Sequence, residues 1–107
     1  MTLVRLCSVD DVPEGQVRRF EHDHRPVAVV NLGPEGFRAI DAICSHAHYF
    51  LDEGEIDVDD ETVECPKHGS TFDLNTGKPR SLPATTGVDV FPVKIDGGDV
   101  LIEVADE

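Results

Sequence analysis

The sequence predicts an all-β protein of 107 residues that forms a single domain. Glycine and proline recur roughly every ten residues, and short runs rich in valine and isoleucine lie between them. Such punctuation is typical of an antiparallel sandwich or barrel. The length fits one domain, and no internal repeat or linker-like stretch divides residues 1–107. We therefore expect one β domain with little helix.

The runs between the turns give the expected strands. In chain order they cover residues 3–6, 16–21, 27–32, 37–43, 55–57, 62–64, 71–73, 88–95 and 100–104. Pro92 interrupts the eighth run, and because proline cannot donate to a strand ladder, it indicates an edge position or a bulge.

Turn and helix signals complete the pattern. Residues 96–99 read Asp-Gly-Gly-Asp between two apolar runs, which predicts a tight hairpin. Residues 75–77 read Asn-Thr-Gly, where glycine supplies a positive φ. A helical turn is expected only at residues 8–13 and 47–51.

Charge and composition exclude several classes of protein. The chain has 22 acidic and 9 basic residues, a formal charge of −13, so a nucleic-acid binder that relies on phosphate contacts is excluded. The apolar runs are far shorter than the ~20 residues of a membrane span. The first eleven residues lack the apolar core of a signal peptide, and three cysteines are too few for a disulfide scaffold. A cytoplasmic location is expected, with cysteines available for metal or redox chemistry.

Two loops each combine a cysteine with a histidine. One residue separates Cys44 from His46, two separate Cys65 from His68, and each pair follows an expected strand. Adjacent strand ends can bring two such loops to one site. This donor set can hold either a tetrahedral zinc ion or a diiron cluster. Zinc sites usually pair like with like, whereas here each loop supplies one residue of each type.

The order C-x-H followed by C-x₂-H-G-S resembles the Rieske [2Fe–2S] family. Residues 71–78 are similar to the strand and turn after the second cluster loop of that family. Residues 81–84, Ser-Leu-Pro-Ala, are similar to its third, proline-containing loop, which covers the cluster. Length and acidity resemble the small soluble Rieske ferredoxins that supply electrons to aromatic-ring dioxygenases.

The resemblance implies one Rieske [2Fe–2S] cluster per chain, held by a small cluster-binding subdomain at about residues 43–84. Cys44 and Cys65 would bind the inner iron, and His46 and His68 the outer iron. Further residues are expected to surround the cluster without binding iron: His48, Lys67, Ser70 and Pro83.

The implied function is one-electron transfer from a flavoprotein reductase to a terminal oxygenase, with docking through basic surfaces of these partners. Such a chain is a carrier and not an enzyme, since the sequence supplies no nucleotide site, mononuclear iron site or activated nucleophile. Two other functions stay open. The chain could be a Rieske protein linked to iron–sulfur assembly or a reductase small subunit, or it could be a zinc-stabilised binding module.

Departures from the high-potential, respiratory Rieske pattern predict a low reduction potential. Tyr49 and Lys67 stand where that class has two bridging cysteines, and Phe72 stands where it has a tyrosine hydroxyl, although Ser70 is present. Fewer donors to the cluster sulfurs and many nearby carboxylates both stabilise the oxidised state. A midpoint below zero is expected, in the lower half of a family range of about −150 to +300 mV.

The remaining candidates have plainer interpretations. Cys7 is expected to be a buried structural thiol. His48 is spaced to compete with His46, but the family spacing selects His46. His22 and His24 are expected to be polar turn residues rather than a metal pair.

An acidic run is the last feature that the sequence singles out. Eight carboxylates occur at residues 52, 53, 55, 57, 59, 60, 61 and 64, and no Lys or Arg occurs between Arg38 and Lys67. The run can be a solvated face, or it can steer a basic partner toward the metal site. Both interpretations stay open.

Overall fold

The structure, a computed structural model, describes residues 2–44, 49–66, 69–80 and 86–104. Its strands are β1 (Thr2–Ser8), β2 (Val17–His22), β3 (Arg25–Asn31), β4 (Phe37–Asp41), β5 (Ile56–Asp57), β6 (Thr62–Glu64), β7 (Thr71–Asp73), β8 (Val90–Phe91), β9 (Val93–Asp96) and β10 (Asp99–Val104). Three short 3₁₀ turns are η1 (Val9–Asp11), η2 (Gly33–Glu35) and η3 (Leu51–Glu53). The predicted all-β class is confirmed.

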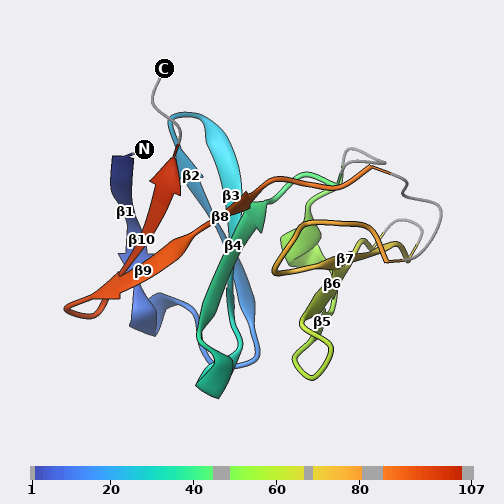
Figure 1. Cartoon of the computed structure of the whole chain (residues 1–107), viewed down its shortest axis with the longest axis horizontal. Helices are drawn as coiled ribbons and strands as arrows, with labels where there is room; N and C mark the ends of the chain where they lie inside the picture. Colours follow the sequence, from blue (N-terminus) through green and yellow to red (C-terminus); the bar gives the residue numbers. More distant parts are fainter. Residues whose placement is uncertain (1, 45–48, 67–68, 81–85, 105–107) are drawn as a thin grey trace.

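The strands form three antiparallel sheets (Figure 1). The central sheet has the order β2-β3-β4-β8, the outer sheet β1-β10-β9, and the small sheet β5-β6-β7. In Figure 1 the central sheet lies between the other two. The small sheet and its loops therefore form a separate lobe on one side of the central sheet.

Both faces of the central sheet are covered, which explains the apolar run in β3. Val27 and Val29 pack in a core cluster shared with the outer sheet. Ala28 and Val30 pack in a second cluster that contains Val63, Phe72 and Leu74 from the small lobe. All four β3 residues are buried, because a strand with two covered faces needs apolar residues at every position.

Strand ends agree with the sequence prediction to within two residues, apart from one division. Pro92 splits the predicted run 88–95 into β8, at an edge of the central sheet, and β9, at an edge of the outer sheet. The expected edge position is confirmed, and the Pro92 carbonyl accepts the Glu103 N–H at 3.0 Å. The expected helical turn at 8–13 is η1, whereas the one at 47–51 lies partly outside the described residues; Tyr49 and Phe50 are not helical, η3 begins at Leu51, and η2 was not predicted.

The turns follow the predicted chemistry. Gly97 and Gly98 join β9 to β10 with positive φ values of 59° and 87°. Asp23 and His24 also have positive φ, 53° and 68°, between the paired residues His22 and Arg25. The two histidines are therefore part of a tight hairpin, as expected. Among the described residues, no helix is long and apolar enough to cross a bilayer.

Candidate metal centre

The first cysteine loop begins where β4 ends. The Cys44 N–H donates to the Tyr49 carbonyl at 3.0 Å, and the Leu51 N–H donates to the Ala42 carbonyl at 2.7 Å. Ile43 and Phe50 form a β-bridge between these two hydrogen bonds. The two ends of the loop, residues 42–44 and 49–51, are therefore hydrogen-bonded to each other. Cys44 lies at the base of the loop, with only 3% of its surface exposed.

The second cysteine loop connects β6 to β7. The Cys65 N–H donates to the Ser70 carbonyl at 2.7 Å, and the Cys65 carbonyl accepts the Gly69 N–H at 3.0 Å. Gly69 has a φ of 77°, a left-handed conformation that glycine adopts without steric cost. Cys65 is 1% exposed, so this loop repeats the arrangement of the first, with a buried cysteine at its base.

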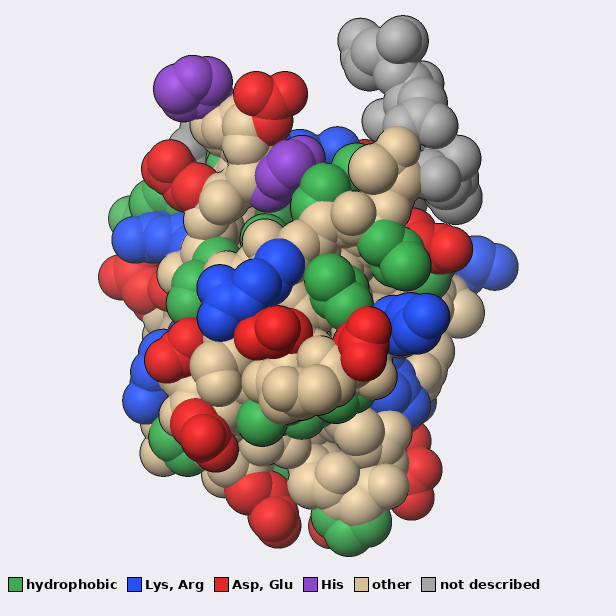
Figure 2. Space-filling model, turned by 90° about the vertical axis from the view of Figure 1, so that its left-hand side faces the viewer, with side chains coloured by type: hydrophobic (Ala, Val, Ile, Leu, Met, Phe, Trp, Pro, Cys, Tyr) green, Lys and Arg blue, Asp and Glu red, His purple; other side chains and the backbone are tan. Residues whose placement is uncertain are grey.

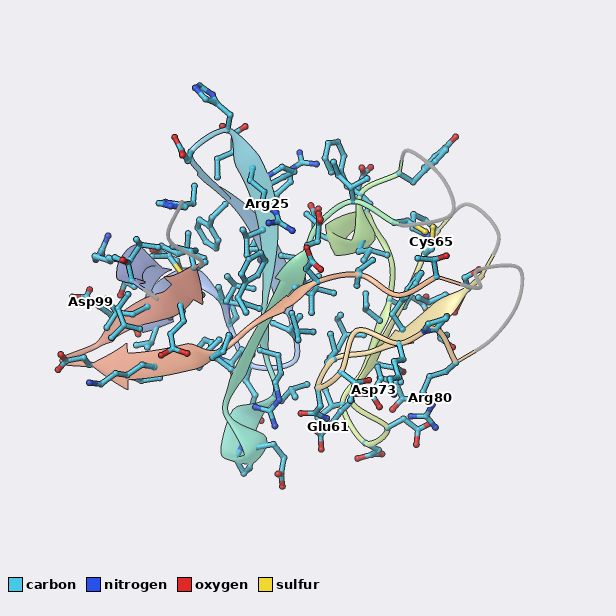
Figure 3. The ribbon with its side chains drawn as sticks, turned by 45° about the horizontal axis from the view of Figure 1, so that its top comes forward. Arg25, Glu61, Cys65, Asp73, Arg80 and Asp99 are labelled. Atoms are coloured by element: carbon cyan, nitrogen blue, oxygen red, sulfur yellow. The ribbon has the colours of Figure 1, made fainter. Side chains whose placement is uncertain are left out.

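The two cysteines belong to one core cluster. Cys44 and Cys65 pack with Leu51, Val63 and Phe72, and neither cysteine forms a disulfide (Figure 3 labels Cys65). Two free cysteines in one core cluster, each followed in sequence by a histidine, fit a metal or iron–sulfur centre of mixed sulfur and nitrogen ligands. Burial of both thiols also fits the prediction that they bind the inner metal position.

Several predicted site residues lie outside the described part of the chain: His46, His48, Lys67, His68 and Pro83. Within the described residues, no group of three or more Cys, His, Asp or Glu side chains is arranged to hold a metal ion. This is consistent with the predicted ligand set, because only its two cysteines are described. The histidine ligands stay a prediction.

The structure describes three further residues that the sequence analysis singled out near the cysteines. Ser70 is completely buried directly before β7, and Phe72, also completely buried, packs in the same cluster as both cysteines. Phe72 brings no hydroxyl to this interior. Tyr49 is 44% exposed at the end of the first loop.

A close backbone approach holds the small lobe together next to Cys65. A Cβ on Gly54 would lie 1.6 Å from the Glu64 carbonyl oxygen, so only glycine permits this contact. Beside it, the Glu64 N–H donates to the Glu55 carbonyl at 2.8 Å. Gly54 therefore lets the segment after the first loop run directly against the strand that carries the second.

The acidic run divides into engaged and exposed carboxylates. Glu61, 25% exposed, accepts from Arg38 at 3.2 Å, and Arg38 also donates to Asn75 at 2.7 Å. Asp52, 15% exposed, lies 3.7 Å from Arg19. The other six are exposed: Glu53, Glu55, Asp57, Asp59, Asp60 and Glu64. Four of these line a groove on the small sheet, together with one cation, Arg80, and we call it the acidic groove: Glu55, Asp57, Asp60 and Glu64.

These arginines were missed by the sequence reasoning. Arg38 lies on β4, and its guanidinium reaches the turns before β6 and after β7. Arg19 lies on β2 and stacks over Phe50, 3.7 Å from the ring centre. For Arg38 the only signal in the sequence was a cation in a mainly apolar run, whereas Arg19 lies in a polar strand and gave no signal. Nothing in the sequence identified the partners of either arginine.

Cys7 is confirmed as a buried structural thiol. It is 2% exposed and packs between the outer and central sheets, away from the two loop cysteines. Burial, with a smaller contribution from the Asp11 carboxylate, raises the pKa of the Cys7 thiol to about 11. A thiol with so high a pKa is a poor nucleophile and a poor metal ligand at neutral pH.

Comparison with known proteins agrees with these features. The family model for the Rieske [2Fe-2S] domain matches residues 2–92. The 3-phenylpropionate/cinnamic acid dioxygenase ferredoxin subunit of Shigella flexneri serotype 5b (strain 8401) is 45% identical over 105 residues, which cover 97% of this chain and 95% of the relative. The ferredoxin of carbazole 1,9a-dioxygenase from Nocardioides aromaticivorans IC177 has a similar structure, with a TM-score of 0.89, 34% identity, and coverage of 95% of this chain and 97% of that one.

A further similar structure contains a partner protein. It is the complex of reduced oxygenase and oxidized ferredoxin in carbazole 1,9a-dioxygenase. One chain of that complex matches with a TM-score of 0.84 and 34% identity, over 94% of this chain and 91% of that one.

Proposed function

Because this chain belongs to the Rieske [2Fe–2S] family, we propose that Cys44, His46, Cys65 and His68 are the ligands of its cluster. The chain is an electron carrier of the dioxygenase ferredoxin type and not itself a catalyst. When bound, the cluster supplies a one-electron couple between its diferric and mixed-valence states. The protein's own task is to hold the ligands and to present them to a partner.

The described residues support this division of tasks. The two cysteines are anchored at the bases of their loops by backbone hydrogen bonds at 3.0 and 2.7 Å, and both are buried. Cys44 and Cys65 would hold the iron inside the protein. His46 and His68, which follow them in the loops, would hold the iron through which electrons enter and leave.

The observation that carries the proposal is the burial of two free cysteines in one core cluster, each of them followed in the sequence by a histidine. The test is the visible absorption and the iron, sulfide and zinc content of the purified protein. We expect a coloured protein with two irons and two sulfides per chain, and bleaching on reduction. Colourless protein with one zinc per chain would contradict the proposal.

The electron acceptor that we propose is a terminal oxygenase, and the donor is a flavoprotein reductase. Support comes from the complex of oxygenase and ferredoxin formed by a similar protein. The aromatic substrate of the oxygenase does not follow from the likeness, since similar ferredoxins serve 3-phenylpropionate/cinnamic acid and carbazole dioxygenases.

We also propose that the acidic groove steers a basic surface of one partner toward the cysteine loops. The groove is lined in part by Glu64 and Thr71, which are paired across β6 and β7 next to the second loop. The surface in Figure 2, on the side of the outer sheet, instead shows basic and acidic side chains interspersed. Clustered charge of one sign accelerates association with an oppositely charged surface.

A further inference from the structure

The small lobe is joined to the central sheet at two points that lie side by side. The chain leaves the central sheet after Asp41, at the end of β4, and returns at Asp89, just before β8. The Asp41 N–H donates to the Asp89 carbonyl at 2.9 Å, next to the pairing of Ile40 with Val90. All four proposed cluster ligands lie between these two points, which we call the neck.

One arginine contacts both sides of the neck. Nη2 of Arg25, on the neighbouring strand β3, lies 3.2 Å from Oδ2 of Asp41 and 2.5 Å from Oδ2 of Asp89. The guanidinium also lies over the Phe91 ring, 4.8 Å from its centre. In Figure 3 Arg25 lies on the central sheet, whereas Cys65 lies out on the small lobe.

The contacts of Arg25 continue to the first cysteine. The second carboxylate oxygen of Asp41 accepts the Ile43 N–H at 3.0 Å, and Ile43 directly precedes Cys44. The intervening Ala42 N–H donates to the Pro26 carbonyl, next to Arg25, at 3.1 Å. The backbone N–H groups of residues 41–44 therefore all donate hydrogen bonds. Arg25 contacts the Asp41 carboxylate, which accepts the bond from Ile43.

We propose that Arg25 is a positioning residue that clamps the neck and so holds the Cys44 loop in place for the cluster. The inference rests on the proposed function, because it assumes that Cys44 is a ligand. Arginine suits this place, since one nitrogen of its guanidinium donates to both carboxylates while the flat face of the group stacks on the ring, and an ammonium has no flat face to stack. An exposed ion pair alone contributes little to overall stability, so the effect expected is local.

The test compares Arg25→Gln and Arg25→Lys with a matched control, Arg5→Gln. Arg5 forms an ion pair of 2.9 Å with Asp99 between β1 and β10, remote in sequence from the neck. Two readouts apply to the holoprotein: hydrogen–deuterium exchange measured by mass spectrometry, and the rate at which visible absorbance is lost in excess iron chelator.

Loss of the clamp predicts a local pattern. In Arg25→Gln, exchange in peptides covering residues 39–44 and 86–91, and the rate of cluster loss, are expected to rise about fivefold, while exchange in β10 stays unchanged. Arg25→Lys is expected to fall between wild type and Arg25→Gln. Arg5→Gln is expected to leave the neck and the rate of cluster loss unchanged.

Three results would overturn the inference. The first is an exchange rate at the neck of Arg25→Gln that equals the wild-type rate. The second is a rise of exchange in β10 of Arg25→Gln as large as the rise at the neck. The third is a rate of cluster loss in Arg5→Gln as high as in Arg25→Gln. If Arg25→Gln does not fold, Asp89→Asn removes one side of the clamp at a carboxylate that is 72% exposed, and the same pattern is expected. A wild-type protein without iron would refute the proposed function instead, and exchange at the neck would then still test the clamp.

Discussion

Asp59 and Asp60 offer the sharpest test of electrostatic steering. Both are exposed in the turn before β6, and Asp60 lines the acidic groove. We expect the double variant Asp59→Asn/Asp60→Asn to accept electrons from its reductase more slowly at low salt. Glu61, the next residue, is left intact because its carboxylate accepts from Arg38 at 3.2 Å and from Asn75 at 3.1 Å.

The expected magnitude follows from Coulomb's law. A carboxylate at a water-exposed site interacts with a partner cation about 10 Å away by about 0.4 kcal/mol, so two such charges contribute about 0.8 kcal/mol. That energy corresponds to a rate about fourfold lower at low ionic strength. At 0.1 M salt, where the Debye length is about 10 Å, screening reduces the effect to less than twofold.

The assay is stopped-flow reduction of the cluster by the reductase, at salt concentrations from about 10 mM to about 300 mM. The control, Asp10→Asn/Asp96→Asn, changes the net charge equally at two exposed residues, in η1 and in β9. It is expected to react at close to the wild-type rate. Equal rates for the groove variant and wild type at low salt would refute steering and leave solvation as the role of these carboxylates.

Three further outcomes are expected. Because folding raises the Cys7 pKa from 9.0 to about 11, unfolded chains release this proton at lower pH than folded chains do. The free energy of unfolding should therefore fall as pH rises from about 9 to about 11. Urea unfolding of Cys7→Ala should lack this part of the decline. Gly54→Ala should lower the free energy of unfolding by about 3 kcal/mol in the same assay, because the Glu64 carbonyl must move. Gly15→Ala, at a φ of 78° with open space around it, should lower it by about 1 kcal/mol. Equal losses in the two variants would contradict the close approach at Gly54. Redox titration should give a midpoint below zero, since Phe72 brings no hydroxyl to the buried cysteines, and a value above about +100 mV would contradict that reasoning.

The strands that carry the second loop could be predicted from sequence because their signals are local. Residues 62–64 and 71–73 are strands as predicted, since turn residues bound both short runs. Pro92 likewise indicated an edge position, because proline has no backbone N–H to donate to a neighbouring strand. The spacing of Cys44 and Cys65 from their histidines was enough to indicate the centre, and the structure buries both cysteines together.

The parts that could not be predicted depend on pairing between distant segments. The neck exists because β4 pairs with β8 across the whole small lobe, and no local pattern shows that Asp41 and Asp89 meet at Arg25. The acidic run shows the same limit. Glu61 is indistinguishable from its neighbours in sequence, yet its contact with Arg38 on β4 makes it a structural residue rather than a steering charge.

We propose that two cysteines and two histidines hold one [2Fe–2S] cluster, and pulsed EPR of the reduced protein detects these ligands themselves. With ¹⁵N-labelled histidine, we expect the unpaired electron to couple to two histidine nitrogens, and the same two couplings should remain in His48→Asn. A cluster without nitrogen couplings would contradict the claim. So would a second coupling that survives in His46→Asn but is lost in His48→Asn.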